Sequence, residues 1–258
     1  MKVLNLTYTF NTRDLGGLKT KDNKVIKNNL LIRSGVLKKL SNVDIELLKS
    51  HNIKTIIDFR SEKEFIERPD VKIEGVIYLN FPALKPHNIP KKKDDKHQDS
   101  NLLQLVDKEE GGMKLMLNTY KDLVTSKKGI QAYQNFFNTL LNYEGAFLWH
   151  CSQGKDRAGL AAFFLEYILG VPMEECINDY LYTNVAMELK IKELTPLVLK
   201  MSNNDETLLP ILRDVFEAKI EYLNEALKWI NEIYGSLDNF IINTLNVDVD
   251  KLKDKFLV

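Results

Sequence analysis

The sequence predicts an α/β fold in which a mainly parallel central sheet is flanked by helices. Three observations lead to this prediction. Short apolar runs alternate with helical patterns, one apolar run ends at a polar loop that opens an apolar helix, and the C-terminal third follows helical spacing. With 258 residues, 44% of them hydrophobic, the chain is long enough for one large domain, 1–258, with a full core.

Four short apolar runs have the length and composition of buried strands. They are residues 30–32, 55–57, 76–79 and 146–149. Three helical patterns lie between or after them, at residues 44–50, 129–141 and 160–169. Ser41 is placed to cap the first of these helices, and Gly170 followed by Pro172 is placed to end the last. Because parallel strands end at one edge of a sheet, we expect the functional site at that edge.

The C-terminal third carries apolar residues at helical spacing and predicts helices that pack on the sheet. Residues 194–201 and 207–213 each contain a proline and predict a further short helical pair that borders the site opening. The polar patch at residues 179–184 is expected to support the central loop from behind, or alternatively to form only a helix-end network.

Residues 85–113 predict a lid-like or flexible insertion within the domain. The segment is polar and interrupted by prolines, then has a short apolar stretch and a Gly-Gly pair. It would shield the site or meet acidic substrates and anionic lipid, and the alternative is an ordinary solvated loop. His87 and His97 are not accompanied there by a set of metal-ligating residues, so they are interpreted as solvent-facing.

The loop from His150 to Gly159 is the most informative feature of the chain, because it separates Cys151 from Arg157 by five residues between a strand and a helix. Such a loop can wrap its backbone N–H groups around one oxyanion, with the positive end of the helix aimed at the same point. Gly154 supplies a backbone conformation that other residues adopt poorly. The planar guanidinium of Arg157 can hold two phosphate oxygens, and the positive surroundings favour a nucleophilic thiolate. The alternative is a buried structural thiol.

The pattern His-Cys-x-x-Gly-Lys-Asp-Arg-x-Gly resembles the signature of the bacterial branch of cysteine-dependent tyrosine phosphatases. The resemblance covers most of the chain, and only the insertion at 85–113 matches loosely. Its other matching segments are residues 11–17, 31–35, 58–61, 179–180, 183–184 and 234–236. The resemblance implies a phosphorylated protein as substrate, through phosphotyrosine and also phosphoserine or phosphothreonine, with phosphoinositides as an alternative. It implies no metal and no cofactor.

The resemblance also implies a two-step mechanism. Cys151 attacks phosphorus, Arg157 and the loop hold the phosphoryl oxygens, and a phosphocysteine forms before water hydrolyses it. Asp156 is the preferred general acid, although a carboxylate there could merely complement the helix dipole. The predicted phosphate- and substrate-binding residues are Ser152, Gln153, Gly154, Lys155, Ala158 and Gly159.

Asp58 is a competing general acid, because it ends the apolar run at 55–57 and reaches the same sheet edge. Alternatively it pairs with Arg60 or Arg13 and only braces the site. The predicted supporting residues are His150, Asp58, Arg60, Arg13 and Asp14.

Two loop positions bear on substrate and rate. Lys155 would add a second cation beside Arg157 and favour substrates with more than one anionic group, unless it is a solvated surface lysine. Ala158 stands where the resembling family usually has Ser or Thr, whose hydroxyl bonds the thiolate. Because a hydrogen bond to a charged group contributes about 1.5 to 3 kcal/mol, its loss predicts a dephosphorylation step slower by roughly ten- to a hundredfold.

Composition is typical of a soluble cytoplasmic enzyme. Lys plus Arg and Asp plus Glu both total 36, so no global charge favours nucleic acid. No stretch approaches the 18 or so apolar residues of a membrane span, and the first residues lack the apolar region of a cleaved signal.

Cys176, the second of two cysteines, is interpreted as a packing residue. Because a disulfide with Cys151 would disable the nucleophile, we expect a reducing compartment. Secretion without a cleaved signal stays open, and the sequence predicts no oligomeric state.

Three functions remain in competition at this point. The first is a phosphotyrosine phosphatase, and the second is a phosphoinositide phosphatase that uses the same site. The third is a weakly catalytic phospho-binding module, whose turnover Ala158 would slow. The presence of Cys151, Asp156 and Arg157 argues against the third. A sulfurtransferase loop fits the chain less well.

Overall fold

The computed structural model describes residues 2–85 and 111–258, and its centre is a six-stranded sheet of order β1-β2-β3-β6-β4-β5. The pairs β3–β6, β6–β4 and β4–β5 are parallel, whereas β1–β2 and β2–β3 are antiparallel. The mainly parallel sheet is therefore confirmed. The strands are β1 (Lys2–Val3), β2 (Arg13–Asp14), β3 (Leu31–Ser34), β4 (Ile53–Asp58), β5 (Ile77–Asn80) and β6 (Ala146–His150).

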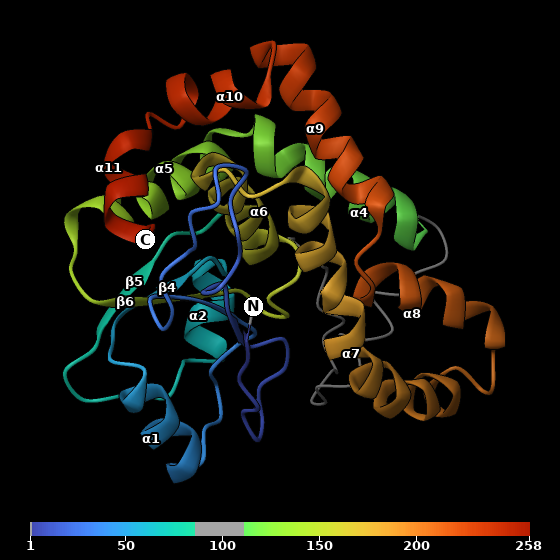
Figure 1. The fold of residues 1–258 in the computed structure, drawn as a ribbon. Helices are drawn as coiled ribbons and strands as arrows, with labels where there is room; N and C mark the ends of the chain where they lie inside the picture. The colour runs from blue at the N-terminus through green and yellow to red at the C-terminus, as the bar shows by residue number, and fades with distance from the viewer. Residues whose placement is uncertain (1, 86–110) are drawn as a thin grey trace.

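Helices cover both faces of the sheet (Figure 1). In the figure α1 lies apart from the larger group that contains α5, α6, α10 and α11. The helices of the described residues are α1 (Asn42–Ser50), α2 (Glu62–Glu67), α4 (Gly112–Thr125), α5 (Lys127–Asn142), α6 (Arg157–Leu169), α7 (Met173–Met201), α8 (Leu209–Phe216), α9 (Ile220–Tyr234), α10 (Leu237–Asn239) and α11 (Val249–Phe256). Short 3-10 and π segments lie at Glu206–Leu208 and Phe240–Thr244.

Successive side chains of β6 point to opposite faces of the sheet and join two separate hydrophobic clusters. Phe147 and Trp149 join the large cluster under α4, α5, α6 and α9, whereas Ala146 and Leu148 join the smaller cluster under α1. All residues of β6 are buried, because helices cover both sides of a central parallel strand. The strand therefore delivers the loop that follows it from a fixed position.

The predicted helix ends are also confirmed. Ser41 caps α1 in a capping box with Asp44, and Gly170 ends α6 with a φ of 96°. Residues 194–201 differ from the prediction of a separate short helix, because they continue α7, which runs 29 residues with Pro196 inside it. Met187, Ile191 and Val198 of that helix pack against α8 in a cluster of their own, and this packing outweighs the cost of the proline.

The predicted insertion at 85–113 falls almost entirely outside the described residues, which resume at Gly111 just before α4. Across residues 2–85 and 111–258, no helix combines the length and the apolar character needed to cross a membrane.

Candidate active site

The loop between β6 and α6 leaves the centre of the sheet at its carboxyl edge. His150 is the last residue of β6, Cys151 follows it directly, and Arg157 is the first residue of α6. β3 and β4 flank β6 in parallel, so Ser34 and Asp58 end beside His150. The loop therefore lies at the sheet edge where the sequence analysis expects the site.

Four consecutive backbone carbonyls of this loop are held from outside by other parts of the chain. Arg33 of β3 binds two of them, and Asn11 and the Val36 amide bind one each. The contacts are Val36 N to Ser152 O at 3.3 Å, Asn11 Nδ2 to Gln153 O at 3.1 Å, Arg33 Nε to Gly154 O at 2.8 Å and Arg33 Nη2 to Lys155 O at 3.2 Å.

These contacts fix the direction of the amides. In a trans peptide the C=O and the next N–H point in opposite directions, so the N–H groups of residues 153–156 face away from the carbonyl partners. None of those N–H groups donates to another group within the described part of the chain. Gly154 has a φ of 68°, and a Cβ there would lie 2.5 Å from the Ser34 oxygen, so only glycine fits this bend. The loop presents a row of free donors, as an oxyanion site requires.

A buried charge network fixes Arg33 in place. Asp179 of α7 binds Arg33 at 2.7 Å and Arg13 at 2.6 Å, and Thr183 accepts from Arg33 at 3.2 Å. Burial alone would raise the pKa of Asp179, but the two guanidinium groups lower it, so the carboxylate is charged. The patch at 179–184 thus supports the loop from behind, as predicted. Arg33 itself was absent from the predicted site residues.

Glu166 of α6 lies beside this network and is fully buried. Burial, followed by the Asp179 charge, raises its pKa well above the usual value. Arg13 and Arg33 both pair with the Asp179 carboxylate.

Glu64 of α2 binds Arg157 and is a residue that the sequence analysis missed. Its carboxylate accepts from Arg157 Nη1 at 2.8 Å and Nη2 at 3.3 Å, and from Ser152 Oγ at 2.5 Å. Burial would raise the pKa of Glu64, but the Arg157 charge holds it well below its usual value. The pattern Ser61-x-x-Glu64 after a strand is a sequence signal for a helix start, but it carries no information about Arg157 as a second partner.

Asp156 lies at the rim of the loop with its side chain 20% exposed. The Tyr120 hydroxyl of α4 donates to its Oδ1 at 2.9 Å, and Lys155 Nζ lies 3.3 Å from the same oxygen. Asp156 is therefore more than a helix-dipole partner, because two donors from different parts of the chain converge on it.

Lys155 differs from both expectations, since it is neither solvated nor free for substrate. It is fully buried, and besides Asp156 its ammonium reaches the carbonyl oxygens of Val215 at 2.6 Å and Glu217 at 3.1 Å. These three acceptors match the three protons of an ammonium group. The end of α8, which follows in sequence by about sixty residues, decides this placement.

Asp58 is not placed as a general acid, because it is buried and bound to Arg60. Arg60 Nη2 lies 2.7 Å from Asp58 and 3.0 Å from Asp70, and His150 Nε2 lies 3.0 Å from Asp70. Burial would lower the pKa of His150, but the two carboxylates raise it. Asp58, Asp70 and His150 lie close enough to hold a metal ion, but the guanidinium already bridges the two carboxylates. The structure thus shows the Asp58–Arg60 pair that the sequence analysis gave as an alternative.

The other predicted residues have structural contacts. Arg13 binds Asp179 rather than Asp58. Asp14 accepts from the backbone N–H groups of Gly16 and Asn29, so its described hydrogen bonds hold a turn and none of them reaches residues 151–157.

Ala158 and Gly159, in the first turn of α6, also have defined surroundings. The Ala158 carbonyl accepts from the Trp149 indole at 3.1 Å. A Cβ on Gly159 would lie 2.8 Å from Arg33 Nη2, so glycine lets Arg33 reach the loop.

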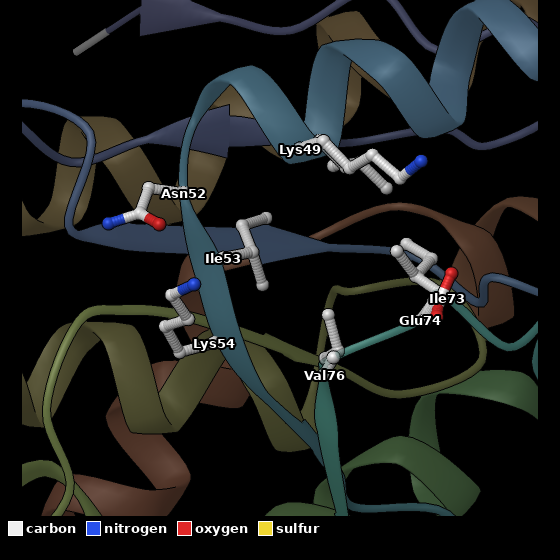
Figure 2. Close-up of a pocket in the computed structure, with 9 residues that line it drawn as sticks. Lys49, Asn52, Ile53, Lys54, Ile73, Glu74 and Val76 are labelled. Atoms are coloured by element: carbon white, nitrogen blue, oxygen red, sulfur yellow. The ribbon is translucent and has the colours of Figure 1, made fainter.

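A cavity of about 210 Å³ lies at the opposite, amino end of β4 and β5 (Figure 2). Ile53, Ile73 and Val76 surround it, with Lys49 and Lys54 beside them. A second cavity, of about 350 Å³, lies between α7 and α8. Neither is lined by a residue of the loop from Cys151 to Arg157.

A buried cysteine that opens a loop of unpartnered amides, with an arginine at the start of the next helix, is the arrangement of a cysteine-dependent phosphatase. The sequence places the chain more closely: residues 4–258 match the tyrosine phosphatase family, and the chain belongs to that family.

Individual relatives agree with this assignment. A Cupriavidus necator protein whose name contains the words tyrosine-protein phosphatase is 27% identical over 247 residues, covering 96% of this chain and 85% of that protein. Triple specificity protein phosphatase PtpB of Mycobacterium tuberculosis is 24% identical over 266 residues, covering 93% of each chain. A crystal structure of P. aeruginosa TpbA with pTyr is 12% identical and covers 89% of this chain and 87% of that one, with a TM-score of 0.30. At that TM-score the likeness carries no inference.

Proposed function

We propose that this tyrosine phosphatase hydrolyses phosphotyrosine through a phosphocysteine on Cys151. The observation that supports the proposal best is the row of N–H groups at residues 153–156, which are turned inward because their carbonyls are bound outside. Three equatorial phosphoryl oxygens need several donors at once, and preorganised donors lose no energy to rearrangement during the reaction. Arg157 adds a positive charge at the same helix end.

The first step forms an S–P bond and breaks the P–O bond to the tyrosine oxygen. The leaving phenolate needs a proton, and Asp156 is the acid on the rim that can supply it. In the second step water attacks the phosphocysteine, Asp156 accepts the proton that water loses, and inorganic phosphate leaves as the thiolate is restored. Ala158 brings no hydroxyl to this step, so phosphoenzyme breakdown is expected to be slow.

Phosphotyrosine is proposed as the preferred substrate, ahead of phosphoinositides. A phosphoinositide carries further phosphates that need further cations, and Lys155 was the candidate for that role. Its three ammonium protons already have acceptors in Val215, Glu217 and Asp156, so a second phosphate would have to displace one of them. Phosphoserine and phosphothreonine activity is proposed as a secondary activity. The name of the PtpB relative, which ascribes three specificities to that protein, supports the broader range.

The test uses the chain's two cysteines as a matched pair. Cys151→Ser is expected to abolish hydrolysis of p-nitrophenyl phosphate and of phosphotyrosine peptides. Cys176→Ser, which changes a fully buried thiol whose pKa is raised by burial, is expected to retain it. Undiminished activity in Cys151→Ser would contradict the mechanism. Parallel assays with phosphoserine peptides and phosphoinositide vesicles rank the substrates, and faster phosphoinositide hydrolysis would overturn the proposed order.

The proposed site of action is the cytoplasm. Cys151 and Cys176 are both free thiols, and a thiolate nucleophile works only while it is reduced.

A further inference from the structure

We propose that Tyr120 is a positioning residue for the general acid, and that it selects Asp156 Oδ2 as the atom that gives up the proton. This inference rests on the proposed function of Asp156. It concerns which of the two carboxyl oxygens faces the leaving group, and which side chain makes that choice.

Both described donors to Asp156 meet the same oxygen. The Tyr120 hydroxyl donates to Oδ1 at 2.9 Å, and the Lys155 ammonium lies 3.3 Å from Oδ1. Among the residues that the structure describes, none donates to Oδ2. A carboxylic acid holds its proton on one oxygen and accepts hydrogen bonds on the other. With Oδ1 occupied by two donors, the proton is held on Oδ2.

Tyr120 is fixed firmly enough to define this direction. The side chain is fully buried, with its ring edge-on to Tyr180 and tilted against Tyr222 at centroid distances of 6.3 and 5.6 Å. Its hydroxyl donates to Asp156 Oδ1, and it lies 2.8 Å from the Tyr180 hydroxyl, which can supply the proton of that second contact. Burial, reinforced by the Asp156 charge, raises the pKa of Tyr120 well above its usual value, so the phenol stays a donor.

The chemical consequence concerns the first step of the reaction. While the S–P bond to Cys151 forms and the P–O bond breaks, the proton moves from Asp156 Oδ2 to the leaving oxygen, and Asp156 becomes a carboxylate. The donors on Oδ1 stabilise the negative charge that develops there. Without Tyr120 the carboxyl group would rotate, and its proton would face the leaving oxygen for only part of the time.

The test compares two leaving groups in a Tyr120→Phe variant, which keeps the ring and removes the hydroxyl. Phenyl phosphate releases a phenol with a pKa near 10 and needs the acid, whereas the nitro group of p-nitrophenyl phosphate stabilises the departing anion. The quantity measured is kcat/KM, which reports the steps through phosphocysteine formation. We expect a loss of about tenfold on phenyl phosphate and of less than about twofold on p-nitrophenyl phosphate.

Tyr222→Phe is the matched control, because its hydroxyl binds the Asp214 carbonyl at 2.9 Å rather than Asp156. It is expected to change both substrates by the same factor. In an Asp156→Asn background, Tyr120→Phe is expected to cause no further selective loss, since both act through one carboxyl group. If Tyr120→Phe fails to fold, Tyr120→Met replaces it, with thermal melting to show that the variant assayed is native.

An equal loss on both substrates, no loss on either, or the same selective loss in Tyr222→Phe would each overturn the role of Tyr120. Failure of the proposed function has a different signature. In that case the wild-type chain hydrolyses neither substrate, or Cys151→Ser remains active.

Discussion

Replacing Glu64 by glutamine tests whether an ion pair outside the loop sets the position of Arg157. The amide keeps the shape of the side chain but retains one oxygen of the two that accept from Arg157 at 2.8 and 3.3 Å. One hydrogen bond to a charged group is lost, which is worth about 1.5 to 3 kcal/mol. Because the Glu64 side chain is 37% exposed, solvent screening places the loss at the lower end of that range.

A loss of about 1.4 kcal/mol corresponds to a tenfold change in rate, so we expect kcat/KM for p-nitrophenyl phosphate to fall by about tenfold. Vanadate binding, measured by competitive inhibition, is expected to weaken in parallel, because in the proposed mechanism Arg157 also holds the ground-state anion. Glu62→Gln is the control, since Glu62 is exposed in the first turn of the same helix.

Tighter vanadate binding in Glu64→Gln would refute the reasoning, because it would show that Glu64 competes with phosphate for Arg157 instead of positioning it. The pair also has a defined pH dependence. As the folded pKa of Glu64 is lowered, its contribution to stability is fully present above the unfolded value of about 4.3 and is lost as the pH falls. Glu64→Gln is therefore expected to lose less stability on acidification than the wild type.

Three other substitutions test separate parts of the site. Arg33→Met leaves two loop carbonyls without a donor, at about 1 to 3 kcal/mol each, so the free energy of unfolding in urea should fall by about 2 to 6 kcal/mol. A loss below 1 kcal/mol would contradict that estimate. Ala158→Ser should speed phosphoenzyme decay by roughly tenfold or more in rapid-quench experiments, and unchanged decay would show that a hydroxyl there has no role. For His150, whose folded pKa is raised, the stabilisation is full below the unfolded value near 6.5 and disappears as the pH rises. The difference in Tm between wild type and His150→Gln should thus be largest at low pH, and a pH-independent difference would mean that His150 stays neutral.

Several contacts at the site were beyond prediction from the sequence. Lys155 illustrates the reason: its partners are the carbonyls of Val215 and Glu217, and backbone carbonyls carry no sequence signal. Glu64 caps α2, and its contact with Arg157 depends on how α2 packs beside the loop. Tyr120 lies in α4, a helix that the sequence analysis does not predict, so its contact with Asp156 is known only from the fold.

The sequence by itself determined the parallel sheet, the strand-to-helix position of the loop, and the spacing of five residues between Cys151 and Arg157. Those features are local, because hydrophobic periodicity and the conformation needed at Gly154 are properties of neighbouring residues. The tertiary structure alone decided that Asp58 pairs with Arg60, that Lys155 is buried, and that Glu64 and Tyr120 contact residues of the loop. Charges and donors find partners by proximity in space, and segments tens of residues apart in the chain supply them.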